Sequence, residues 1–296
     1  MGGAVVRSVV LLLCLLQERV SGDAEIRGNG IVIKTTSRLA GAIDSLTWNG
    51  KEFIDSADHG RQLQSACAFG EGGKGFVAET YNPTEAGSRD DGAGPRSTSV
   101  LLSLKAEKNV LETRTQMAFW LKPGQKSEGQ TARNPKALSE HVVSKKVTIG
   151  WKDLPNVIEV VVTFTIPAGE SHRYAQFEAL TGYMPAEFSK FLAFDPATGQ
   201  AAPLSDGPGE QKLPVILSTE SGSHAMGIWS PEPSPGYGRW RFAAEKVVKW
   251  NCVFRRSDPK GVPAGDYVFR LFVGVGSLAE VTASLRKCST GHPMPR

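Results

Sequence analysis

The 296-residue sequence has few of the side chains from which metal and nucleic-acid sites are built. It has four cysteines and five histidines, with no Cys-x-x-Cys pair and no Cys/His cluster, so we expect no structural zinc site. Its 34 basic residues are scattered among 30 acidic ones and leave a net charge of only +4. No basic surface for nucleic acid is therefore expected.

Several catalytic motifs are also missing. The sequence contains no Gly-x-Ser-x-Gly, no His-Glu-x-x-His and no phosphate-binding loop. The glycine-rich stretch 70–75 lacks the Gly-Lys-Ser/Thr ending that a phosphate loop requires. Any chemistry must therefore come from side chains that the fold brings together.

No apolar run is long enough to span a bilayer, which needs about 20 residues. The longest, residues 9–16, follows a single Arg and precedes the small residues Ser21 and Gly22, as in a secretory signal peptide. We expect residues 1–22 to be removed and the mature chain to be secreted or periplasmic, with no membrane association. The alternative is a buried N-terminal strand or helix. Three cysteines then remain, which allow one disulfide at most: Cys67, Cys252 and Cys288.

The remaining residues, 23–296, read as short strands separated by Gly, Pro, Asn and Asp. Asn49-Gly50 predicts a type I′ turn in a hairpin over residues 41–55. Further strand pairs are expected within 97–120, 141–167, 213–231 and 247–276. Ser277 and Glu280 form a capping box that begins a C-terminal helix, and a weaker helical turn is expected at 186–191. The prediction is an all-β fold, one large antiparallel sandwich domain with one C-terminal α-helix.

Residues 56–66, SADHGRQLQSA, are dense in polar side chains and poor in core-forming ones. A guanidinium offers a rigid fork of donors, and amides offer both a donor and an acceptor, a combination that suits sugar hydroxyls. The candidates for binding a substrate are His59, Arg61 and Gln62. An ordinary solvated loop would have the same composition.

Residues 80–94 hold the densest group of carboxylates, namely Glu85, Asp90 and Asp91, together with the aromatic Tyr81. Paired carboxylates serve as acid and base in glycoside chemistry, so Glu85 is a catalytic candidate and Tyr81 a substrate-binding one. The same oxygens could bind Ca²⁺ at 85–91. A solvated acidic loop is the third interpretation.

Residues 170–185 alternate polar with apolar side chains, as a strand with one polar face does. His172 and Glu178 fall on that face and are the best candidates for a general acid and base. An outward-facing strand without a ligand would have the same pattern.

Aromatic and basic residues gather between 224 and 242, among Pro and Gly. Aromatic rings stack on the C–H face of a pyranose while basic groups bind its hydroxyls. The substrate-binding candidates here are His224, Trp229, Tyr237 and Arg239, unless the rings simply anchor the packing.

Residues 41–64, GAIDSLTWNGKEFIDSADHGRQLQ, resemble the opening of the galactose-mutarotase-like domains of aldose epimerases and other sugar-processing enzymes. The resemblance implies a supersandwich fold and a sugar site lined by the Gly60-Arg61 pair with Gln62. The later His motif of the epimerases and their C-terminal Glu base have no match here. Two stretches, 81–87 and 180–185, resemble exported bacterial proteins, and that comparison implies no activity.

Together these patterns favour an exported protein that binds a carbohydrate. The leading hypothesis adds acid–base processing of the sugar by a hydrolase, lyase or epimerase. The alternative is a carbohydrate-binding or envelope-associated structural module without catalysis. The sequence leaves open whether the protein is an enzyme.

Overall fold

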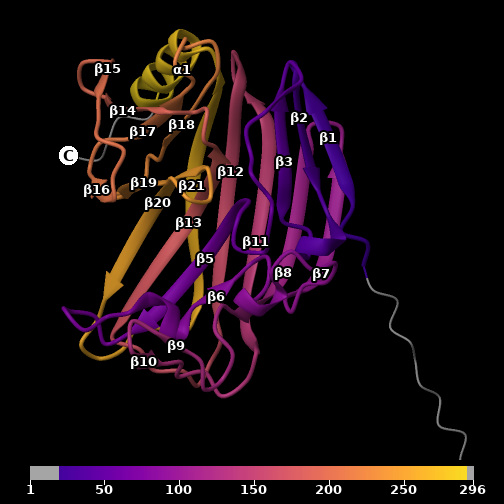
Figure 1. The fold of residues 1–296 in the computed structure, drawn as a ribbon, viewed down its shortest axis with the longest axis vertical. Coiled ribbons are helices and arrows are strands. Elements are labelled where there is room, and N and C mark those ends of the chain that lie inside the picture. The colour runs from indigo at the N-terminus through magenta and orange to yellow at the C-terminus, as the bar shows by residue number, and fades with distance from the viewer. Residues whose placement is uncertain (1–19, 292–296) are drawn as a thin grey trace, which may run out of the picture.

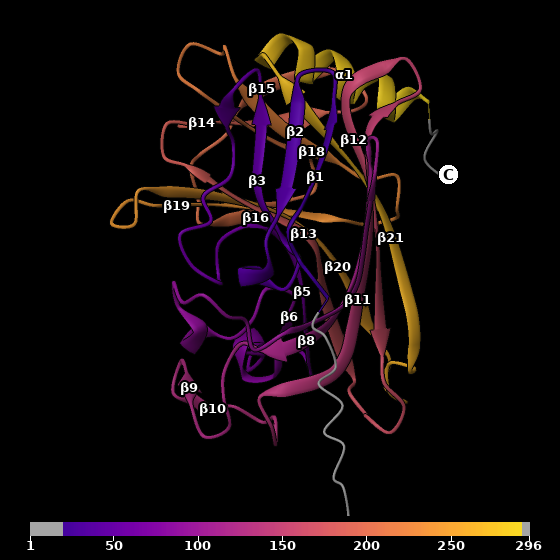
Figure 2. The same ribbon diagram turned by 90° about the vertical axis from the view of Figure 1, so that its right-hand side faces the viewer.

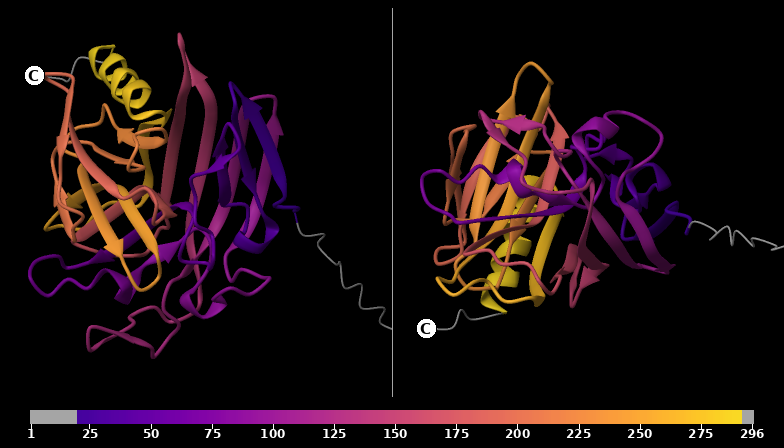
Figure 3. Two further views of the ribbon diagram at one scale, coloured as in Figure 1. Left: turned by 45° about the horizontal axis from the view of Figure 1, so that its top comes forward. Right: turned by 90° about the horizontal axis from the view of Figure 1, so that it is seen from below.

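The computed structural model describes residues 20–291. All but the last three residues of the expected leader, 1–22, lie outside that range. Two antiparallel β-layers pack face to face, with helix α1 (Leu278–Thr290) at one end and the hairpin β9 (Lys126–Ser127) and β10 (Gln130–Thr131) at the other (Figures 1 and 3). Hydrogen bonds join 19 strands into one network, because β6 (Pro83–Thr84) bridges the two layers.

Each layer is a series of neighbouring antiparallel strands, and Figure 2 shows part of the first layer nearly edge-on at its right-hand side. The first layer runs through β7 (Val100–Glu107), β8 (Val110–Phe119), β11 (Leu138–Trp151), β12 (Leu154–Ile166), β21 (Gly265–Gly276), β18 (Ala225–Trp229), β17 (Val215–Ser218), β14 (Lys190–Asp195) and β15 (Gln200–Pro203). The second runs through β16 (Gly209–Gln211), β19 (Gly236–Phe242), β20 (Val247–Ser257), β13 (Tyr174–Pro185), β5 (Leu63–Gly70), β3 (Ile43–Trp48), β2 (Ile31–Thr35) and β1 (Ala24–Gly28), with β4 (Lys51–Glu52) paired to β3.

The core fills the space between the layers with aliphatic and aromatic side chains. Alternate residues of β12, from Val160 to Ile166, are buried on one face, as their period of two predicts. Rings from facing layers meet: Phe164 lies 5.3 Å from Phe177. Each such buried side chain contributes about 1.5–3 kcal/mol. The all-β sandwich with one C-terminal helix is confirmed.

Local turn and cap signals are confirmed as well. Asn49 and Gly50 have φ of 49° and 83°, the left-handed values that a type I′ turn needs. Ser277 Oγ accepts a hydrogen bond from the Glu280 amide, and the Glu280 carboxylate accepts one from the Ser277 amide. Helix α1 packs against β21 and β18 through Val281, Leu285 and Cys288.

Two expectations about local structure are wrong, one about a hairpin and one about a helical turn. Strands β20 and β21 do not form a hairpin, because β20 pairs with β13 and β19 while β21 pairs with β12 and β18. They lie in opposite layers, where Phe254 stacks on Phe269 at 4.4 Å, so the connection between them crosses the sandwich. Residues 186–191 form a turn that leads into β14 rather than a helical turn.

Cys67, Cys252 and Cys288 are all buried, and neither Cys67 nor Cys252 forms a disulfide within residues 20–291. Burial raises the pKa of the Cys67 and Cys252 thiols, which keeps them protonated and inert. Within residues 20–291, no helix is both long and apolar enough to cross a membrane.

Candidate functional site

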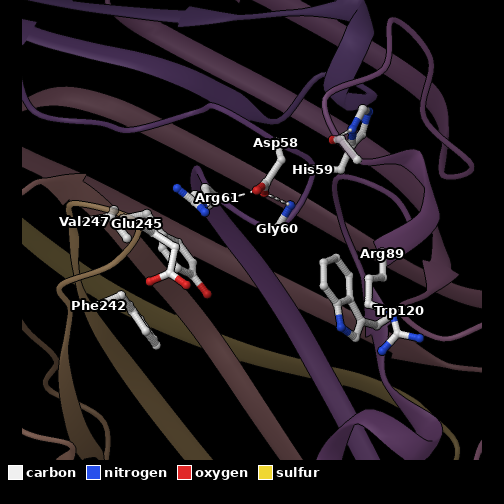
Figure 4. A pocket seen from close by; sticks show the side chains of 11 residues that line it. Asp58, His59, Gly60, Arg61, Arg89, Trp120, Phe242, Glu245 and Val247 are labelled. Atoms are coloured by element: carbon white, nitrogen blue, oxygen red, sulfur yellow. Dashed lines mark hydrogen bonds and ion pairs between the residues drawn. The ribbon is translucent and has the colours of Figure 1, made fainter. Parts of the chain in front are cut away.

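A recess of about 290 Å³ opens where four separate segments meet on the outer side of the second layer (Figure 4). The segments are the loop after β4, the loop that contains the 3₁₀ turn Arg89–Asp91, the end of β8, and the β19–β20 turn with its neighbour β13. The residues that line the recess are Asp58, His59, Gly60, Arg61, Arg89, Gly92, Trp120, Tyr183, Phe242, Glu245 and Val247.

The polar stretch 56–66 forms one rim, and most of its side chains hold the loop in place. The His59 ring is buried, with its nitrogens 2.7 Å and 2.8 Å from the backbone carbonyls of Gly92 and Arg38. Gln62 and Gln64 each donate a side-chain hydrogen bond back to the loop, to the carbonyls of Asp58 (2.6 Å) and Gly60 (2.9 Å). Of the three expected ligand-binding residues, the structure thus presents Arg61, while His59 and Gln62 support the loop.

Arg61 is fixed by Asp58, whose carboxylate lies 3.2 Å from the Arg61 Nε atom. The same carboxylate accepts a hydrogen bond of 2.8 Å from the Gly60 amide. The guanidinium is therefore oriented before any ligand arrives, which lowers the entropy cost of binding.

Trp120 forms one wall, and its position depends on Gly60. A Cβ atom at position 60 would lie 2.8 Å from the Trp120 Cη2 atom, closer than real Cβ contacts allow. The Arg89 amide donates a 2.8 Å hydrogen bond to the Trp120 carbonyl, which ties Arg89 to the same wall. In Figure 4, Phe242 and Glu245 lie across the gap from Trp120.

Beside the recess, an ion pair organises two aromatic rings on the face of β13, β19 and β20. The Lys249 ammonium lies 5.2 Å from the Tyr183 ring centre and 4.8 Å from that of Trp240. The Glu178 carboxylate is 3.6 Å from the ammonium and accepts a hydrogen bond from the Thr181 hydroxyl. Although burial opposes both charges, each partner stabilises the other, so the pKa of Glu178 is lowered and that of Lys249 is raised. Glu178 thus stays ionised near neutral pH, where a general acid would need a proton.

His172 does not lie with Glu178. Its ring is 5.0 Å from Phe69 and 4.8 Å from Tyr81, on the inner side of the sheet, whereas Glu178 faces outward. The Glu170 carboxylate is 2.9 Å from the His172 Nε2 atom and 3.4 Å from that of His141. The structure therefore joins two of the expected residues, Tyr81 and His172, in a cluster remote from Arg61 and closed to a ligand on the outer face.

This cluster predicts a pH-dependent stability. Burial lowers the pKa of His141 from its usual 6.5 to about 4, so the folded protein favours the neutral ring. The unfolded chain then binds more protons below pH 6.5, and stability is lost as the pH falls from 6.5 towards 4. We expect a loss of about 2 kcal/mol between pH 6.5 and 5, measured by urea unfolding.

The matched variants for that measurement are His141→Phe and His224→Phe. Phenylalanine at 141 keeps a ring against Phe69 (4.8 Å in the native pair) and removes the titrating group, so the pH slope should flatten. The second variant changes a half-buried histidine outside the cluster and should keep the slope. An unchanged slope in His141→Phe would contradict the assignment.

The carboxylates of the 85–91 loop are already occupied by donors from the protein. Glu85 is fully buried and lies 2.7 Å from the Lys145 ammonium. Asp91 accepts hydrogen bonds from the Ser88 and Thr98 amides, and Asp90 from the Gln125 side chain. Hydrogen-bond donors thus fill the places that a calcium ion would need. The part of the chain that the structure describes holds no group of three or more His, Cys, Asp or Glu arranged for a metal ion.

The four substrate-binding candidates of 224–242, namely His224, Trp229, Tyr237 and Arg239, do not line the recess. Trp229 and Tyr237 are almost fully buried beside α1 and β17, where Trp229 stacks on Phe272 at 5.7 Å. Arg239 is tied to Ser205 and Gln211. His224 packs against Trp48 at 5.7 Å, near the β3–β4 hairpin.

Sequence patterns alone did not single out most of the lining. The recess residues that were missed are Arg89, Gly92, Trp120, Tyr183, Phe242, Glu245 and Val247. The alternation of 247–256 contained one usable signal, since it places Lys249 and Asn251 on the outer face opposite Tyr183 and Thr181. Arg89, Trp120 and Glu245 lie in loops and turns that no period describes, and Phe242 is the last residue of β19.

Similar folds occur among solved structures of sugar-converting enzymes. The chain superimposes on a proposed aldose 1-epimerase from Escherichia coli K12 with a TM-score of 0.52 at 10% identity, over 86% of this chain and 99% of that one. It matches an α-mannosidase from Enterococcus faecalis V583 with a TM-score of 0.57 at 12% identity, over 93% of this chain and 31% of the mannosidase. The chain has the aldose-epimerase supersandwich fold.

A glycosyl hydrolase family 38 protein from Enterococcus faecalis shares this supersandwich, with a TM-score of 0.54 at 14% identity over 93% of the chain and 32% of that protein. The supersandwich thus occurs both as a whole protein and as about a third of a longer glycosidase. No family model and no curated protein matches the sequence. The resemblance at residues 41–64 is therefore confirmed for the fold, and the fold alone.

Proposed function

We propose that this protein binds a carbohydrate in the recess between Trp120 and Tyr183. The observation that carries the proposal is the Trp120 wall, held against Gly60, with the oriented Arg61 guanidinium beside it. An indole face packs on the C–H face of a sugar ring, while a guanidinium donates several hydrogen bonds to its hydroxyls. Recesses that combine aromatic walls with a few fixed polar groups are the usual form of small-molecule sites.

The fold supports the same class of ligand. The structures that share it include a proposed aldose 1-epimerase and an α-mannosidase, whose names refer to sugars. Binding follows from the lining more directly than catalysis does, because Glu178 is held as an ion pair with Lys249 and His172 lies elsewhere. Glu245 is the carboxylate in the recess that no ion pair within residues 20–291 engages, so an acid–base reaction would depend on it.

We also propose that the protein acts outside the cytoplasm, on the basis of the leader-like segment 1–22. N-terminal sequencing of the protein from its native host tests this. A mature start near Asp23 supports export, and an intact Met1 overturns it.

The functional test is a screen of the purified protein against plant, algal and bacterial polysaccharides and their monosaccharides. Thermal shift and isothermal titration report binding, and chromatography of the mixtures reports products. Binding that Trp120→Ala abolishes supports the proposal. A product that Glu245→Gln abolishes, with binding retained, would add catalysis. No binding by any carbohydrate would overturn the proposal.

A further inference from the structure

We propose that the sugar is acidic, and that its carboxylate or sulfate group binds the Arg89 guanidinium on the Trp120 wall. This inference rests on the proposed carbohydrate-binding function and specifies its ligand. It follows from which charges of the recess are already neutralised within the protein and which are not.

Arg89 is an exposed cation that forms no close ion pair within residues 20–291, and its charge is only the weakest of the influences that lower the pKa of Asp90. Across residues 20–291, no carboxylate lies within 4 Å of its guanidinium, whereas Arg61 is paired with Asp58 and Lys249 with Glu178. The two acids that follow Arg89 in sequence are engaged elsewhere. Asp90 lies 3.2 Å from the Lys122 ammonium, and Asp91 accepts hydrogen bonds from backbone amides. The guanidinium charge is therefore available to a ligand.

The backbone of Arg89 is fixed at the wall of the recess. Ser88 and Asp91 form a capping box around the 3₁₀ turn that contains Arg89, and the Arg89 amide is bonded to the Trp120 carbonyl at 2.8 Å. Indole and guanidinium thus belong to one wall, as Figure 4 shows. A sugar stacked on Trp120 would hold a ring substituent close to Arg89, where the planar fork binds a carboxylate or sulfate through two parallel hydrogen bonds.

Glu245 on the opposite wall determines the orientation in which an acidic sugar binds. Glu245 is exposed and, like Arg89, has no ion-pair partner in the described chain. Its carboxylate accepts hydrogen bonds from hydroxyls and repels a second acid. An acidic sugar would therefore place its acid towards Arg89 and its hydroxyls towards Glu245. An amino sugar would bind in the reverse sense, with its ammonium at Glu245.

The experiment compares affinities for four matched sets of oligosaccharides, namely uronate, sulfated, neutral and amino-sugar oligomers, by isothermal titration of the full-length protein. We expect acidic oligomers to bind at least tenfold more tightly than neutral ones, with an affinity that falls as salt rises. Arg89→Gln should bring the ratio of acidic to neutral affinity close to one. The control Arg96→Gln removes the same charge from an exposed arginine outside the recess and should keep the ratio.

The separate arms identify the acid group. A preference for uronates assigns a carboxylate, and a preference for sulfated oligomers assigns a sulfate ester. Equal affinity for acidic and neutral oligomers, a preference for amino sugars, or a ratio that Arg89→Gln leaves unchanged would each overturn the inference while carbohydrate binding stands. Binding of none of the four sets would overturn the proposed function together with it.

Discussion

Replacing Glu85 with alanine lowers the free energy of unfolding by about 3–5 kcal/mol, because it leaves the Lys145 ammonium buried without a counter-ion. Glu85 is 0% exposed and the Lys145 side chain 2% exposed, and the ammonium lies 2.7 Å from the carboxylate. The carboxylate also accepts a 2.9 Å hydrogen bond from the Ser65 amide. The measurement is urea-induced unfolding of the variant and the native protein at neutral pH.

Two further variants distinguish the effect of breaking the buried Glu85–Lys145 pair from the effect of removing a charge at the surface. Glu112→Ala breaks the neighbouring surface pair with Lys146, whose members are 46% and 57% exposed, and should cost less than about 1 kcal/mol. The double variant Glu85→Gln/Lys145→Met removes both buried charges, keeps an acceptor for Ser65 and should recover most of the stability. If Glu85→Ala unfolds like the native protein, the pair does not stabilise the fold.

Replacing Trp120 with alanine weakens sugar binding about 30-fold, since truncating a central aromatic anchor costs about 2 kcal/mol. The free energy of unfolding should change by much less than the free energy of binding, because Trp120 is only half-buried at the wall of the recess. Isothermal titration with the tightest ligand of the screen gives the affinity. The control is Trp48→Ala, a half-buried tryptophan that packs on His224 outside the recess and should leave the affinity unchanged.

Gly60→Ala tests the same wall without removing the ring. Gly60 does not have a left-handed φ, so alanine fits the backbone, but its Cβ would meet the Trp120 ring at 2.8 Å. The ring must move, and we expect affinity to fall at least threefold with little loss of stability. Native affinity in both Trp120→Ala and Gly60→Ala would show that the sugar does not stack on this wall.

The residues that resemble epimerases, 41–64, supply only one side of the recess. Gly60 and Arg61 line the recess, and the absence of a Cβ atom at position 60 lets the Trp120 ring lie against it. The indole approaches from a segment sixty positions further along the sequence, a contact that no local pattern encodes. Glu85 is a second case in which the local sequence misled. The acidic residues near it in sequence suggested a reactive loop, whereas in the structure its carboxylate is paired with Lys145 on β11.

The sequence by itself determined the features that depend on neighbouring residues. The alternation from Val160 to Ile166, the Asn49-Gly50 turn and the Ser277–Glu280 cap each rest on contacts within a few positions, and each is present in the structure. Only the tertiary structure decided which strands share a layer and which side chains share a site. In that structure β20 and β21 belong to different layers, and His172 does not lie near Glu178. Arg61, Arg89 and Trp120 line the same recess. The physical reason is that burial and ion pairing depend on which distant segments pack together, and that is a property of the whole fold.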